Sequence, residues 1–250
     1  TIVSPLEYET IGLLGSNLGI GDLDTIARLN AFCNDFGIDT IETGAAIGVA
    51  MEAGLAYFGD EKAAYNFMDE IKNDTLMGKL LGAGASTTGK VLGVKHIPAV
   101  NGQAMPAYDP RAIKGMGITF ATSPMGADHT YGPVVKTDKS FEEASFESQQ
   151  LMAVLDSMGI CMFARAAIGK HKELLVELVN KFHGLELSVD WLDKMAEETI
   201  RDEYKFNELA GFTKSNYRMP DAFIKTKIKS LDTFFDIGQE ELDKIREYYG

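Results

Sequence analysis

The chain has 250 residues, of which 45% are hydrophobic and 24% are charged. This is an ordinary globular composition, with enough apolar material for one large domain or two small ones. The 37 acidic residues outnumber the 24 Lys and Arg, and the net charge of −13 argues against nucleic acid or an anionic membrane as the main partner. No apolar run reaches the ~18–20 residues of a membrane helix. Two cysteines make no disulfide scaffold, so we expect a cytoplasmic protein.

Helical periodicity dominates the first part of the chain. Residues 22–36 carry one apolar stripe, with Asp22 placed to cap the helix start and Gly37 placed just past its end. A second helix is predicted over 43–56, where small residues would let neighbouring elements approach closely. A third is predicted over 60–82, with apolar residues along one side.

A break in periodicity divides the helical pattern into two parts. Residues 94–108 contain prolines and glycines and little periodicity, so we predict a linker there. Strand-like alternation of Val, Ile and Thr is scarce on both sides of this segment. The predicted fold class is therefore all-α, with two related helical domains over residues 1–98 and 99–250.

Start signals for helices recur in the second part. Asp109 followed by Pro110 is typical of a helix start. The Gly- and Pro-rich run 123–139 predicts a loop, and Ser140 with Glu143 forms a capping box directly after it. Further helices are predicted over the remaining periodic segments, 140–158, 163–183, 188–211 and 238–249.

A short pattern occurs twice. NDFGIDTI at 34–41 and DSMGICMF at 156–163 each close a predicted helix with a Gly and an Ile, followed by Asp39 in one copy and Cys161 in the other. The letters AAIG follow both copies within about eight residues. The pattern indicates a weak internal duplication, in which two helical halves present a polar residue toward a shared site.

The polar residues of this pattern have more than one interpretation. A carboxylate such as Asp39 or Asp156 can accept two N–H bonds from a flat ring edge, as in a pterin or guanine. The spacing alone favours a local capping or turn role for both. Cys161 can be a buried small residue, a nucleophile or a metal ligand.

Other candidate motifs are weaker. The run GASTTGKV at 84–91 nearly matches a phosphate-binding loop, but Val91 stands where Ser or Thr binds magnesium. His129 lies beside Asp128 in the Gly- and Pro-rich loop and could donate a proton near neutral pH, although the loop alone does not establish this role. Glu9 carries no signal by itself.

Together these stretches resemble the tungsten-dependent aldehyde:ferredoxin oxidoreductase family. The resemblance covers about two-thirds of the chain, and it rests on four runs in family order: EYETIGLLGSNLGI (7–20), LNAFCNDFGIDTIETG (29–44), NGQAMPAYDPRAIKGMGITFATSPMGADH (101–129) and LDSMGICMF (155–163). It implies that the chain corresponds to the family's two helical domains. The family's N-terminal β-rich domain is then a further partner, expected to have been removed from this chain by truncation.

The resemblance also implies cofactors and their ligands. The family holds tungsten, or molybdenum, between two pterin dithiolenes, with a [4Fe–4S] cluster close by. Asn34, Asp39 and Asp156 fall in the two pterin-facing loops, and Asn34 departs from the family's usual Asp, losing its charge but keeping an acceptor oxygen. Cys161 matches one cluster thiolate. A cluster needs four ligands, so the chain alone is expected to be inactive.

The implied reaction is the oxidation of aldehydes to carboxylic acids with ferredoxin as electron acceptor. Glu9 and His129 fall where the family carries a carboxylate and a histidine near the metal, which implies proton transfer. Two alternatives stay open, an aromatic acyl-CoA reductase-type subunit of the same family and a non-catalytic helical binding module. No nucleic acid or membrane partner is expected, and a homo-oligomer is compatible with this interpretation.

Overall fold

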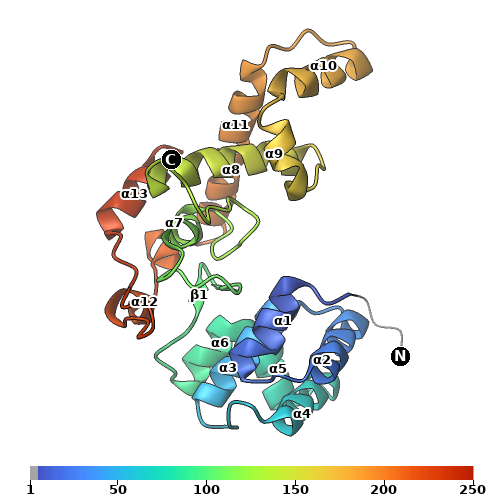
Figure 1. The fold of residues 1–250 in the computed structure, drawn as a ribbon, viewed down its shortest axis with the longest axis vertical. Coiled ribbons are helices and arrows are strands. Elements are labelled where there is room, and N and C mark those ends of the chain that lie inside the picture. The colour runs from blue at the N-terminus through green and yellow to red at the C-terminus, as the bar shows by residue number, and fades with distance from the viewer. Residues whose placement is uncertain (1–4, 250) are drawn as a thin grey trace. The chain divides into compact units, whose positions relative to one another are not determined.

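The computed structural model describes residues 5–249. Its regular structure is almost entirely helical, which confirms the all-α prediction (Figure 1). The chain forms two compact units, one of Thr1–Ala112 with Arg218–Phe235 and one of Ile113–Tyr217 with Asp236–Gly250. The boundary predicted between residues 98 and 99 refers to the two domains of the resembled family and not to these compact units, so it stays a prediction. Within the described residues, no helix is both long enough and apolar enough to cross a bilayer.

The first unit contains eight of the helical segments and one short hairpin. These are α1 (Tyr8–Leu14), the 3-10 helix η1 (Ser16–Leu18), α2 (Leu23–Phe36), α3 (Thr40–Glu52), α4 (Glu61–Lys72), α5 (Leu76–Gly82), α6 (Gly84–Leu92) and α12 (Asp221–Lys225). The hairpin pairs β1 (Ala99–Val100) antiparallel with β2 (Gln103–Ala104) inside the predicted linker.

The second unit contains the other helices and no described strand. They are α7 (Lys114–Thr122), α8 (Phe141–Ser157), η2 (Met162–Ala164), α9 (Arg165–Ile168), α10 (Lys172–His183), α11 (Asp190–Leu209), η3 (Lys214–Tyr217) and α13 (Gln239–Glu247). Buried residues of α8, α10 and α11 make most of its core, with Trp191 packed against them.

The sequence signals for helix ends are largely confirmed. The Asp22 carboxylate accepts a hydrogen bond from the Thr25 amide at 2.7 Å, and the Ser140 hydroxyl accepts one from the Glu143 amide at 3.2 Å. Gly37 adopts the left-handed conformation just past α2, with φ of +72°. These caps satisfy amides and carbonyls that a helix end leaves without partners.

Two predicted helices are broken by local structure. The helix predicted over 60–82 ends at Lys72, because Asp74 turns the chain at φ +52° and Thr75 then caps a new helix through the Gly78 amide at 3.0 Å. The helix predicted over 163–183 is likewise interrupted after Ile168, and α10 begins only at Lys172. Apolar periodicity continues across both breaks, so the period alone does not reveal them.

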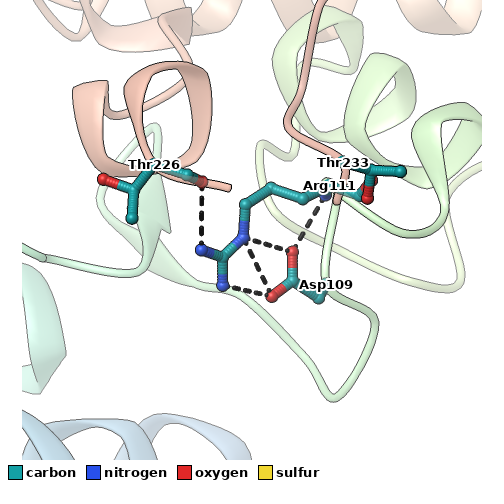
Figure 2. A network of polar contacts seen from close by, with 4 residues as sticks. All are labelled: Asp109, Arg111, Thr226 and Thr233. Carbon is teal, nitrogen blue, oxygen red and sulfur yellow. Dashed lines mark hydrogen bonds and ion pairs between the residues drawn. The ribbon is translucent and has the colours of Figure 1, made fainter. Parts of the chain in front are cut away.

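Asp109 does not start a helix. Its carboxylate accepts hydrogen bonds from the Arg111 side chain, at 2.7 Å from Nη2 and 3.0 Å from Nε, and from the Arg111 amide at 2.9 Å (Figure 2). Arg111 also donates to the Thr226 carbonyl, and the Thr233 hydroxyl donates to the Arg111 carbonyl. Thr226 and Thr233 belong to the segment Arg218–Phe235, which lies more than a hundred positions after Arg111 in the sequence. The network therefore fastens this distant segment to the rest of the first unit.

Helices α1 and α3 approach each other closely through small residues. A Cβ at Gly44 would lie 2.6 Å from the backbone C and O of Leu13, so only glycine fits there. Asn17 donates a hydrogen bond to the Gly44 carbonyl at 3.1 Å and fills the space beside Gly48. The close approach predicted from the small residues of 43–56 is therefore confirmed for α3.

We predict that Gly44→Ala lowers the free energy of unfolding by about 1–3 kcal/mol, because the added methyl overpacks the α1–α3 contact. Gly82→Ala is the matched control within a helix of the same unit, where an added Cβ meets nothing within 4 Å. Chemical denaturation of both variants should show Gly82→Ala as stable as the parent or slightly more so. Equal stability of the two variants would contradict the close-contact explanation.

Candidate functional site

The two copies of the repeated pattern have the same backbone. After α2, Gly37 has φ of +72° and the Ile38 amide donates back to the Cys33 carbonyl at 3.0 Å. After α8, Gly159 has φ of +67° and the Ile160 amide donates back to the Leu155 carbonyl at 2.8 Å. In both copies a left-handed glycine and a six-to-one hydrogen bond end the helix.

The residue two places after each glycine occupies the same local position. Asp39 (φ −71°, ψ 135°) precedes α3, and Cys161 (φ −58°, ψ 135°) precedes η2, so each is the N-cap of a new helical segment. The Asp39 carboxylate accepts a hydrogen bond from the Glu42 amide at 2.6 Å. The capping interpretation is thus correct for Asp39, and it leaves the exposed carboxylate able to accept further bonds.

Glu9 and Asp39 belong to neighbouring elements of the first unit. The Thr10 and Thr40 hydroxyls, each next in sequence to one of these acids, lie 3.0 Å apart. Glu9 is buried, and its Oε2 accepts a hydrogen bond from the Ala107 amide at 2.7 Å. Glu9 therefore ties α1 to the segment after β2.

Asn34 lies apart from this cluster of bonds, on the exposed surface of the last turn of α2. Its amide presents both an acceptor and two donors to the surroundings. Within the described residues, no side-chain hydrogen bond fixes its orientation.

Glu42 is a structural residue that the sequence reasoning missed. Its Oε1 accepts a hydrogen bond from the Ala85 amide at 2.7 Å, and its Oε2 accepts one from the Ala104 amide at 2.8 Å. One carboxylate therefore joins α3 to the start of α6 and to β2. Its position three residues after the N-cap Asp39 has capping-box spacing, but its side chain reaches distant amides instead.

The turn that contains His129 lies near Asp156 in the second unit, because Asp128, the residue before His129, acts electrostatically on Asp156. His129 is half-buried in a turn held by Asp128, whose Oδ1 accepts from the Thr130 amide at 2.6 Å and the Tyr131 amide at 2.9 Å. The Asp128 carboxylate also acts on Asp156: partial desolvation, with Asp128 repulsion added, raises the pKa of Asp156 above its ordinary value. The structure therefore brings the His129 turn toward the end of α8.

A partly buried pair supports the same turn. The Tyr131 hydroxyl donates to the Glu203 carboxylate on α11. Burial raises the pKa of Glu203. The hydrogen bond from Tyr131 lowers this pKa, and repulsion from Asp156 raises it further. The sequence contains no signal for this pair, because the partners lie 72 residues apart and Glu203 is one of several acids on α11.

The two cysteines differ sharply in environment. Cys161 is exposed, whereas Cys33 is fully buried in the first core. Burial raises the pKa of the Cys33 thiol to about 11, so it stays protonated and is a poor metal ligand. Over residues 5–249, no three or more His, Cys, Asp or Glu side chains are grouped to hold a metal ion.

The run GASTTGKV forms no phosphate-binding loop. Its residues build α6, an ordinary helix that packs against α3. A phosphate-binding loop instead needs a glycine-rich turn whose amides converge on the phosphates before a helix begins.

We predict that Glu42→Gln destabilises the protein by about 1–3 kcal/mol, because the new amide NH2 faces a buried backbone N–H that has lost its acceptor. Glu7→Gln removes the same charge at an exposed position that makes no side-chain cap bond, and it serves as control. Urea unfolding compares the two variants. If Glu42→Gln unfolds no earlier than Glu7→Gln, the carboxylate does not hold the three elements together.

We predict that Asp156→Asn stabilises the protein at pH 7. A carboxyl with a raised folded-state pKa binds its proton more tightly in the native state, so stability falls as pH rises through its titration. The negative charge in the last turn of α8 adds an unfavourable helix-dipole term. The gain should disappear near pH 3, where the carboxyl is largely protonated in both states.

The control for this comparison is Asp138→Asn, an exposed acid in the preceding loop. Thermal unfolding at pH 7 and pH 3 should show little change for it at either pH. A gain for Asp156→Asn that is independent of pH would contradict the assignment.

Comparison with known proteins places the whole chain in one family. Residues 3–250 match the family model "Aldehyde ferredoxin oxidoreductase, domains 2 & 3". The tungsten-containing aldehyde ferredoxin oxidoreductases of Pyrococcus horikoshii and Thermococcus kodakarensis are 29% and 28% identical, over 82% of this chain and 39% and 38% of theirs. The WOR-like subunit of an aliphatic sulfonate oxidoreductase of Pyrococcus furiosus is 26% identical over 76% of this chain and 32% of its own. The chain thus spans about two-fifths or less of the length of these relatives, and it belongs to the family of aldehyde ferredoxin oxidoreductase domains 2 and 3.

Proposed function

We propose that this chain forms the cofactor-facing helical part of a tungsten or molybdenum bis-pterin oxidoreductase that oxidises aldehydes to carboxylic acids, with ferredoxin as electron acceptor. The observation that carries the proposal is the pair of matching helix ends, each presenting one polar residue two places after a left-handed glycine. A cofactor with two pterins calls for two such loops, and the family assignment supports the same conclusion.

The hydrogen-bond acceptors of the two loops suit pterin rings. A pterin edge carries N–H groups, and Asp39 and Asp156 offer exposed carboxylate oxygens as acceptors. The Asp156 side chain makes no hydrogen bond within the described part of the chain and has a raised pKa, so a bond from a ring N–H would favour its charged form. Asn34 adds an exposed amide beside the first loop. In this proposal these three residues hold the pterins.

The second loop also offers a side chain that suits an iron–sulfur cluster. Cys161 is an exposed thiol, the ligand type that [4Fe–4S] clusters require. Buried Cys33 does not qualify, so the chain contributes one of four thiolates. In this proposal Cys161 stands at the end of the electron path toward ferredoxin.

The reaction adds one water oxygen to the aldehyde carbon and releases two protons and two electrons. The bound metal supplies the two-electron acceptor chemistry. Among the chain's own residues, we assign proton transfer to Glu9 and His129. The Glu9 carboxylate is held by the Ala107 amide, and the backbone around His129 is held by the Asp128 turn, which suits groups that must hold a set position.

A sulfonate-linked activity is a second candidate, favoured by the similarity to a relative named as an aliphatic sulfonate oxidoreductase subunit. The same loops and the same thiol would serve either chemistry, because the substrate does not change the ligands of the cofactor. Substrate profiling therefore separates the two candidates.

The test uses the natural protein that contains this chain, produced anaerobically with tungstate and molybdate. We expect bound tungsten or molybdenum by elemental analysis, and reduction of benzyl viologen that depends on an aldehyde. Reduction that depends on an alkanesulfonate instead would favour the second candidate. Absence of both metals from correctly folded protein would contradict the proposal and favour a non-catalytic module.

We further expect Cys161→Ser to weaken or remove the electron paramagnetic resonance signal of the reduced cluster, because an alkoxide is a poorer iron ligand than a thiolate. Cys33→Ala removes the buried thiol and should keep that signal. An unchanged cluster spectrum in Cys161→Ser would show that Cys161 is not a ligand.

A further inference from the structure

A cavity of about 850 Å³ lies in the second unit, lined by residues of α11, η3 and α13. None of the residues to which a role has been assigned above lines it. Its volume falls within the range of natural small-molecule sites, so the chemistry of its walls decides what it can hold.

One side of the cavity is aromatic. Tyr204, Tyr217 and Tyr249 line it, with ring centroids 5.8 Å apart for Tyr204 and Tyr217, and 6.3 Å apart for the stacked pair Tyr204 and Tyr249. The Arg246 guanidinium lies 5.1 Å from the Tyr217 ring centroid. Phe212 adds a further apolar ring. These rings suit a flat, apolar body of modest size.

The residues that line the cavity carry a net positive charge, whereas the whole chain is negatively charged. Four cationic side chains (Arg201, Lys205, Lys214, Arg246) and three acidic ones (Glu208, Asp243, Glu247) line the cavity, an excess of one positive charge. The whole chain has a net charge of −13. Such a local excess suits a monoanion better than a multiply charged phosphate ester.

Not all of the positive groups are neutralised. Arg246 is paired with Asp243, and Lys214 lies 3.5 Å from Glu247. Lys205 is exposed and forms no ion pair with the residues that the structure describes. A cation is therefore available at the cavity wall.

Two buried polar atoms, on side chains whose residues line the cavity, lack a hydrogen-bond partner among residues 5–249. These are Nε of Arg246 and the hydroxyl of Tyr249, on side chains that are 8% and 1% exposed. A guanidinium N–H can only donate. Burial raises the pKa of Tyr249, so its hydroxyl stays protonated and can donate as well. Native proteins rarely leave buried donors without acceptors, so these two atoms call for an explanation.

We propose that this cavity binds a small aromatic carboxylate. The ring stacks on the aromatic wall, and the carboxylate accepts hydrogen bonds from Lys205 and, once local side-chain movement uncovers the two buried atoms, from Nε of Arg246 and the hydroxyl of Tyr249. Such a ligand supplies the missing acceptors and matches the single excess positive charge. The proposal concerns a site separate from the cofactor-facing loops and does not depend on the proposed function.

The test titrates the purified full chain with benzoate and with benzamide, followed by ligand-observed NMR. Benzamide has the same ring and no charge, so we expect it to bind at least about tenfold more weakly, as loss of a charge-assisted bond implies. Lys205→Gln and Tyr249→Phe should each weaken benzoate binding several-fold. Lys170→Gln, an exposed position outside the cavity, should leave it unchanged.

Tyr249→Phe keeps the buried ring and removes only the unpartnered hydroxyl, so the variant is expected to fold, and circular dichroism checks this. Three results would overturn the proposal. They are no benzoate binding, equal binding of benzoate and benzamide, or benzoate binding unchanged in the Lys205→Gln/Tyr249→Phe double variant. The last result would place benzoate elsewhere on the protein, for example in the proposed active site.

Discussion

The left-handed glycine at the end of a helix is the constraint on which the candidate site depends. Gly37 and Gly159 take a conformation that L side chains rarely adopt. The following Ile amide then bonds back to the helix, which fixes the direction of the outgoing chain. Asp39 and Cys161 receive similar backbone angles from this arrangement, although one side chain is a carboxylate and the other a thiol. The function proposed for the chain needs two such positions, and the glycines create both.

Carboxylates then fix the surrounding loops, one of them buried (Glu9) and two partly buried (Glu42 and Asp128). Glu42 accepts amides from α6 and β2, Glu9 accepts one from Ala107, and Asp128 closes the turn around His129. A carboxylate can accept several bonds at once, so one side chain can orient backbone from more than one element. Glu9 and His129, to which our proposal assigns proton transfer, therefore lie on segments held by hydrogen bonds, which suits groups that must keep a set position.

The sequence predicted the features that form within a few residues, and it did not predict those that form between distant segments. Asp22, Ser140 and the two loop glycines act within a few residues of themselves, so their caps could be predicted from spacing. The prediction that Asp109 starts a helix is wrong, because its carboxylate binds the Arg111 side chain instead. The residues that hold Arg111 in place, Thr226 and Thr233, lie far along the chain. The Tyr131–Glu203 bond and the cavity beside α11 also depend on distant segments meeting. No periodicity encodes such meetings, because they follow from how whole helices pack.

The shared backbone of the two loops has an evolutionary consequence. Because the Gly-Ile pair sets the path of the chain, the residue two places after each glycine is free to vary without rebuilding the loop. The side chain at this position still matters locally, because the Asp39 carboxylate caps α3 through the Glu42 amide, whereas Cys161 makes no side-chain cap bond at the start of η2. Asp39 and Cys161 show that one backbone arrangement accommodates two side chains of different chemistry, a carboxylate in one loop and a thiol in the other.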